Sequence, residues 1–184
     1  MKNRFAGLMI CISVVGALAS AVTAHAQTTS SQWKQYSYPG EGFSVSSPTE
    51  PVFTRQDKPT ATGTVEMHNY TIEMGNNSGV MISSAEISGA DTVSPQTLLQ
   101  GAKNGAIQTV NAKLTSEKEI TLDGNPGIQF EAANDSFHVR ARMYIVKTKL
   151  ITVLEIAPVN IAISTNADRL CDSMRLGKAV PSAH

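Results

Sequence analysis

The chain has 184 residues, and its 15 basic and 15 acidic side chains give a formal net charge of zero at pH 7. This balance gives no electrostatic reason to expect nucleic acid or an anionic membrane surface as a partner. Aromatic residues make up only 5% of the chain, which argues against a surface that stacks bases or sugars. We therefore exclude nucleic acid as an expected partner.

The first 26 residues are typical of a cleavable secretory signal. Lys2 and Arg4 form a positive n-region, residues 5–22 are apolar or small, and Ala-His-Ala at 24–26 fits the signal-peptidase pattern. An uncleaved membrane anchor is the alternative, because about 18 apolar residues nearly span a bilayer. We expect cleavage before Gln27, a periplasmic or secreted bacterial protein, and no membrane span after cleavage.

Cys171 would be the only cysteine left after cleavage, because Cys11 lies within the signal. A single cysteine cannot form an internal disulfide, so the fold has to depend on its hydrophobic core. Cys171 shares one stripe of an expected helix with Ala167 and Leu170, and we expect it to be a buried free thiol.

The mature chain is long enough to bury the core of one domain without a metal or a cofactor. We divide the sequence into a signal (1–26), a flexible leader (27–32), a single α+β domain (33–177) and a loose tail (178–184). We expect no cofactor.

Eight strands are expected, four before the first helix and four after it. Each expected strand begins and ends next to turn-forming residues or prolines. The expected strands are 33–38, 43–47, 64–74, 80–87, 114–122, 128–133, 136–146 and 149–157. The last three are expected to form a meander with two-residue turns.

This meander has a register that can be worked out from those turns. The expected pairs are Phe130–Val139, Ile128–Ala141, Glu131–His138 and Gln129–Arg140, followed by Ala141–Leu154, Met143–Thr152, Arg140–Glu155 and Arg142–Val153. One face of the meander is then apolar, and the other carries complementary polar partners.

Two helices are expected to pack on the sheet. The first begins at the Ser-Pro pair at 94–95 and repeats apolar residues at a spacing of four over 98–110. The second begins with a capping box formed by Thr165 and Asp168 and ends before Gly177. The order ββββ-α-ββββ-α predicts an α+β fold with a single antiparallel β-sheet flanked by helices.

Several motifs resemble those of exported bacterial proteins of the PsbP-like class. They are Trp33, Tyr38-Pro39, Gly-Phe-Ser-Val-Ser-Ser-Pro at 42–48, Pro51, Leu-Asp-Gly-Asn-Pro-Gly-Ile-Gln-Phe at 122–130, Arg-Ala-Arg-Met-Tyr at 140–144 and Asp-Ser-Met-Arg-Leu at 172–176. The resemblance implies an α-β-α sandwich, as in the photosystem II protein PsbP and the Ran-binding Mog factor. It further implies an accessory or binding module, and it brings no catalytic, metal or Ran-binding residue to this chain.

The polar cluster with the clearest arrangement lies on the strand at 136–146. His138, Arg140, Arg142 and Tyr144 project from one face, about 7 Å apart along the strand, and could hold a phosphate or carboxylate. Ordinary cross-strand pairing is the alternative for Arg140. Arg142 lacks an obvious partner in the expected register and is the leading candidate.

Other chemistry has less support in the sequence. Glu66 and His68 share a strand face as two metal ligands could, but a solvated face explains them equally well. No nucleophile motif is present, and an apolar helix stripe is the wrong setting for a reactive Cys171.

We therefore expect an exported, non-catalytic accessory domain, monomeric by itself, that binds another protein of the cell envelope. The first alternative is a small-molecule or anion binder that uses the face of Arg140, Arg142 and His138. A weaker alternative is a hydrolase whose site is dispersed in the sequence. A partner binder should show an exposed apolar patch, and an anion binder a concave positive site.

Overall fold

The computed structural model describes residues 32–60, 63–75, 78–162 and 164–177, and these described residues belong to one compact unit. The expected signal, the leader up to residue 31 and the tail at 178–184 lie outside the described residues. Among the residues that are described, no helix has both the length and the apolar character needed to cross a membrane.

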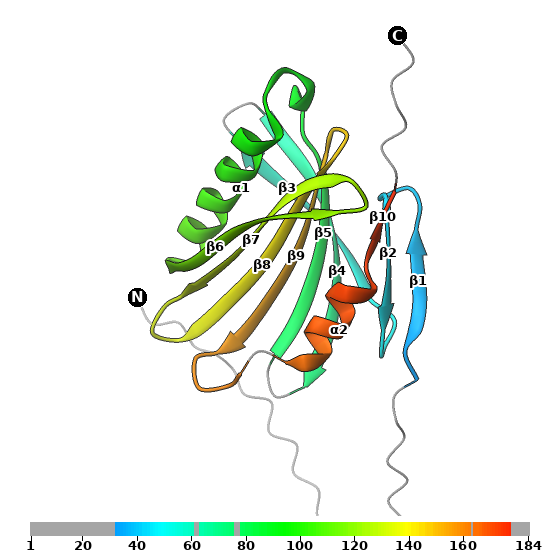
Figure 1. The fold of residues 1–184 in the computed structure, drawn as a ribbon, viewed down its shortest axis with the longest axis vertical. Helices are drawn as coiled ribbons and strands as arrows, with labels where there is room; N and C mark the ends of the chain where they lie inside the picture. Colours follow the sequence, from blue (N-terminus) through cyan, green and yellow to red (C-terminus); the bar gives the residue numbers. More distant parts are fainter. Residues whose placement is uncertain (1–31, 61–62, 76–77, 163, 178–184) are drawn as a thin grey trace, which may run out of the picture. The chain divides into compact units, whose positions relative to one another are not determined.

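The described residues form ten strands, two α-helices and one 3-10 turn (Figure 1). In chain order these are β1 (Lys34–Tyr38), β2 (Phe43–Ser47), β3 (Val52–Thr60), β4 (Gly63–Gly75), β5 (Ser78–Glu86), η1 (Ala90–Thr92), α1 (Pro95–Thr109), β6 (Lys113–Leu122), β7 (Asn125–Ala133), β8 (Phe137–Val146), β9 (Lys149–Pro158), α2 (Thr165–Ser173) and β10 (Arg175–Leu176). They build an antiparallel seven-stranded sheet, β3-β4-β5-β9-β8-β7-β6, and a separate three-stranded sheet, β1-β2-β10.

The expectation of a single sheet flanked by helices is therefore wrong, because the described chain is mostly β and holds two sheets. Pro48 and Pro51 interrupt the chain after β2, and the β1–β2 hairpin pairs with the short strand β10 instead of joining the large sheet. Strand β3 was not predicted from the sequence. This edge strand is exposed along most of its length, so it lacks the apolar alternation that marks a half-buried strand.

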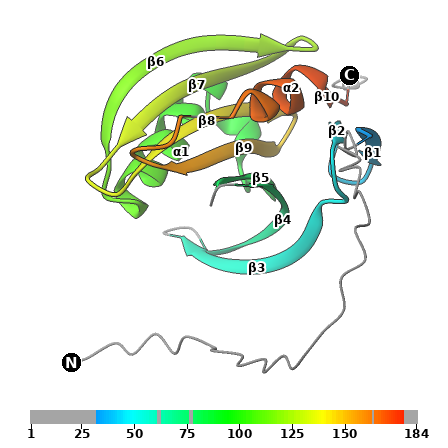
Figure 2. The same cartoon turned by 90° about the horizontal axis from the view of Figure 1, so that it is seen from below.

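The large sheet has an apolar core on each of its faces. On one face, α1 places Leu99 against Phe130 and Ala141. On the other face, Leu170 of α2 and Phe43 of the small sheet belong to a second core. Figure 1 shows α1 on one side of the large sheet and α2 with the small sheet on the other, and Figure 2 shows the seven strands following one another from β6 to β3.

The predicted register is correct between β8 and β9, where Arg140 pairs with Glu155, but it is wrong by two residues between β7 and β8. Asn134 explains the error. Its Oδ1 accepts hydrogen bonds from the backbone N–H groups of residues 136 and 137, at 2.9 and 3.0 Å, and this closes a longer turn than the two residues assumed. As a result, Arg140 faces Glu131 and Arg142 faces Gln129.

The start of α1 agrees with the prediction, since the Ser94 hydroxyl accepts a hydrogen bond from the N–H of Thr97 at 3.2 Å. The second helix begins one residue earlier than expected: its N-cap is Ser164, which accepts from the N–H of Asn166. The capping box at Thr165 and Asp168 is therefore not formed.

Candidate functional site

All four predicted site residues lie on β8, on the face of the large sheet that α2 covers. The structure gives them different surroundings, because α2 brings the acidic side chains Asp168 and Asp172 over this face. Arg140 and Arg142 each contact α2, whereas Tyr144 is buried in the core beside it.

Arg140 holds α2 against the sheet. Its Nη2 lies 2.9 Å from Glu155 Oε2 and 2.8 Å from Asp168 Oδ1. The other oxygen of Glu155 accepts the N–H of Ser164, the N-cap of α2, at 3.0 Å. Burial by itself would lower the pKa of Arg140, but the hydrogen bond and charge of Glu155 raise it. Arg140 is thus engaged in a structural ion-pair network.

Arg142 is less tightly held than Arg140. Its Nε donates to Gln129 Oε1 at 3.1 Å, while its terminal nitrogens lie 3.7 Å from carboxylate oxygens of Asp168 and Asp172. The expectation that Arg142 lacks a partner is therefore wrong. The shifted register supplies Gln129, and the two carboxylates come from a helix that is distant in the sequence.

A groove of about 390 Å³ opens beside Arg142, between β6–β8 and α2. Its lining includes Lys118, Ile120, Leu122, Gln129, Arg142, Tyr144, Cys171 and Asp172. Lys118, Gln129 and Arg142 pair in one row across three strands. Lys118 was not predicted as a site residue, because the expected register placed Gln129 opposite Arg140 and gave no pairs between β6 and β7.

His138 and Cys171 have different environments from those of the arginines. His138 pairs with Ala157, and its Nε2 is buried with no hydrogen-bond partner among the described residues. Cys171 is 9% exposed and free of disulfides, and burial raises the pKa of its thiol. A raised pKa disfavours the thiolate that a cysteine nucleophile requires.

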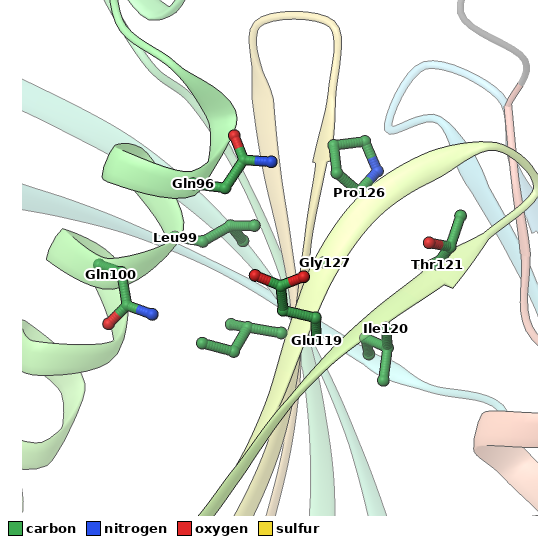
Figure 3. A pocket seen from close by; sticks show the side chains of 9 residues that line it. Gln96, Leu99, Gln100, Glu119, Ile120, Thr121, Pro126 and Gly127 are labelled. Carbon is green, nitrogen blue, oxygen red and sulfur yellow. The ribbon is translucent and has the colours of Figure 1, made fainter.

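A second hollow, of about 320 Å³, lies between α1 and the β6–β7 hairpin. Figure 3 shows Gln96 and Gln100 of α1 on one side and Glu119 and Thr121 of β6 on the other. Gln100 is already engaged, since it donates to Glu117 at 2.7 Å.

His68 lies between two carboxylates. Its Nδ1 is 2.6 Å from Glu41 and its Nε2 is 2.6 Å from Glu66, and only a protonated ring can donate to both. These hydrogen bonds raise the pKa of His68. Glu41 belongs to the β1–β2 turn, so the contact ties the small sheet to β4. No group of three His, Cys, Asp or Glu side chains suited to a metal is found within the described ranges.

Exposed apolar side chains mark the start of β3, an edge strand of the large sheet. Val52 is 64% exposed and Phe53 is 52% exposed. The Phe53 ring packs against His68 and Tyr70, with ring centroids 5.5 and 5.3 Å apart. Phe53 is therefore held in place on its inner side while it presents its outer side to the surroundings.

No model of a known protein family matches the chain. A comparison with curated proteins likewise finds no match.

Proposed function

We propose that this protein is an exported, non-catalytic binding module of the cell envelope, and that its partner is another protein. The observation that carries this proposal is the exposed pair Val52 and Phe53 at the edge of the large sheet. Because consecutive side chains of a strand point to opposite faces, Val52 and Phe53 place an exposed apolar side chain on each face of this edge, and an apolar unpaired edge favours contact with another chain.

The two halves of β3 differ in a way that supports contact at its start. Arg55 and then Asp57, Lys58 and Pro59 follow the first three residues of β3, and charged residues and proline are typical devices that protect an edge strand from pairing. The first three residues, Val52 to Thr54, lack such protection. Among the described residues, no strand pairs with β3 on its outer side, so its backbone there can bind an extended segment of a partner.

Two observations support a non-catalytic role. The raised pKa of the Cys171 thiol disfavours nucleophilic use, and both ring nitrogens of His68 are already bound to carboxylates. A general base needs a ring nitrogen that can reach its substrate.

The test places a photo-activated phenylalanine analogue at Phe53 in the native host, with the same analogue at Val159 as a control. Val159 is 53% exposed and follows the end of β9, which β5 and β4 separate from β3 in the sheet. We expect a discrete cross-linked product with a second protein from the Phe53 position alone. Equal labelling from both positions, or a product that contains only this chain, would contradict the proposal.

A further inference from the structure

We infer that the groove beside Arg142 binds a small carboxylic acid with an apolar body, with Arg142 and Lys118 holding the carboxylate. This site is separate from the β3 surface and does not depend on the function proposed for it. The inference rests on the row of polar side chains, on the incomplete hydrogen bonding of Arg142 and on the apolar wall of the groove.

The row is spaced for a single anionic group. Lys118, Gln129 and Arg142 occupy paired positions on β6, β7 and β8. Adjacent strands lie about 4.8 Å apart, so the two cationic residues are about 10 Å apart at the backbone. Their long side chains can reach one carboxylate between them, above the Gln129 amide.

Arg142 retains the capacity to bind that carboxylate. Its distances of 3.7 Å to Asp168 and Asp172 are those of ion pairs without a hydrogen bond, in contrast to the 2.8 and 2.9 Å contacts of Arg140. Asp168 already accepts from Arg140, and the Asp172 side chain is 77% exposed, where water weakens its attraction. A ligand carboxylate can therefore replace these long contacts with direct hydrogen bonds to the guanidinium, with Lys118 as a second cation against the repulsion from Asp172.

Apolar side chains form another part of the lining of the groove. Ile120 and Leu122 line it and pack against the core, and Tyr144 lies between strands and α2 with 5% of its surface exposed. A volume of about 390 Å³ is in the range of pockets that take small organic ligands, roughly 300–1,000 Å³. A bare inorganic anion would leave this apolar surface unused, so the structure favours a carboxylate joined to an aliphatic or aromatic body.

The experiment is a nuclear magnetic resonance titration of the whole mature protein with three probes. Octanoate has both a carboxylate and an apolar chain, acetate has only the carboxylate, and octanol has only the apolar chain. We expect octanoate to shift the amide signals of β6, β7 and β8 around the groove and to bind at least about tenfold more tightly than either of the others. Equal binding of acetate, or equal binding of octanol, would overturn the assignment.

Variants link the binding to the named residues. Arg142→Gln should weaken octanoate binding about tenfold or more, because it removes a charge-assisted contact. Lys118→Gln should weaken it about two- to fivefold, since Lys118 is exposed and its substitution spares the core. Lys113→Gln is the matched control, because Lys113 lies at the start of the same strand and outside the groove. This substitution should leave the affinity for octanoate unchanged. Unchanged affinity in a folded Lys118→Gln protein would overturn the role of the row, even if Arg142→Gln fails to fold.

Discussion

At the scale of single residues, the polar side chains of the α2-facing surface divide into those that hold the fold together and those that remain available. Arg140 and Glu155 belong to the first group, because each has short contacts to α2. Arg142 and Lys118 belong to the second. Arg140 and Arg142 look alike in the sequence, and only their different contacts with α2 separate them.

Loss of Glu155 should destabilise the protein strongly. Its side chain is 4% exposed and accepts hydrogen bonds from Arg140 and from the backbone of Ser164. We expect Glu155→Ala to lower the free energy of unfolding by about 2–4 kcal/mol, because it leaves a buried guanidinium with one partner fewer. Urea denaturation measures this change in the free energy of unfolding. Asp168→Asn, at a side chain that is 45% exposed, should cost less than about 1 kcal/mol, and an equal loss in both variants would contradict the assigned roles.

Stability should fall as the pH rises through the pKa of His68. Glu41 and Glu66 raise this pKa, with Arg55 and Lys149 as the cations beyond them. A raised folded pKa gives stabilisation that is complete below the unfolded value of about 6.5 and is lost above the folded one. Because the His68 side chain is 30% exposed, we expect a change below about 1 kcal/mol.

Urea denaturation at several pH values between 6 and 9 tests this dependence, roughly the range over which a raised histidine pKa loses its proton. The matched variant is His68→Gln, in which the decrease should be absent. A decrease of the same size in the variant would show that another group causes it.

At the scale of elements, close packing between β7 and β8 fixes one glycine. A Cβ atom on Gly127 would lie 2.5 Å from Met143 O and from the Tyr144 ring. Gly127→Ala should therefore destabilise the protein by about 1–3 kcal/mol by forcing apart two paired strands. In contrast, Gly101→Ala in α1 meets nothing within 4 Å and should stabilise the protein by about 0.5–1 kcal/mol. Thermal or urea unfolding should show a lower free energy of unfolding for Gly127→Ala and a higher one for Gly101→Ala. An unchanged free energy of unfolding in Gly127→Ala would contradict this packing.

Elements with local signals could be predicted from the sequence, and those that depend on distant contacts could not. The Ser-Pro pair fixed the start of α1, and the tight turn after β8 fixed the β8–β9 register. The β7–β8 register was missed because the Asn134 side chain closes a longer turn. Strand β3 was missed because an exposed edge strand needs no apolar pattern.

The candidate site shows the same limit. Arg142 and Tyr144 were identified from their shared strand face, and both do line the groove. Lys118 was not identified, since its place beside Gln129 follows only from the correct register. The carboxylates of Asp168 and Asp172 could not be placed, because no local pattern tells which face of the sheet α2 covers.

At the scale of the whole molecule, export remains an expectation from the first 26 residues. We predict that the protein recovered from its host begins at Gln27, because Ala-His-Ala at 24–26 fits the cleavage pattern. Intact-mass measurement checks this directly. Recovery of protein that retains Met1 would contradict cleavage and favour the anchor.

Two surfaces on different parts of the described unit carry the functional proposals. The apolar start of β3 is suited to a protein partner, and the groove beside Arg142 is suited to a small acid. Substitutions at one surface should leave the other unaffected, because residues that share no contacts usually act independently.

The most direct test of protein binding is native mass spectrometry of the protein isolated gently from its own host, compared with Phe53→Ser and with Val159→Ser. We predict a complex with a second protein for the unaltered chain and for Val159→Ser, and its loss for Phe53→Ser. A bare monomer in all three samples, or a complex that survives Phe53→Ser, would contradict a protein-binding surface at the start of β3.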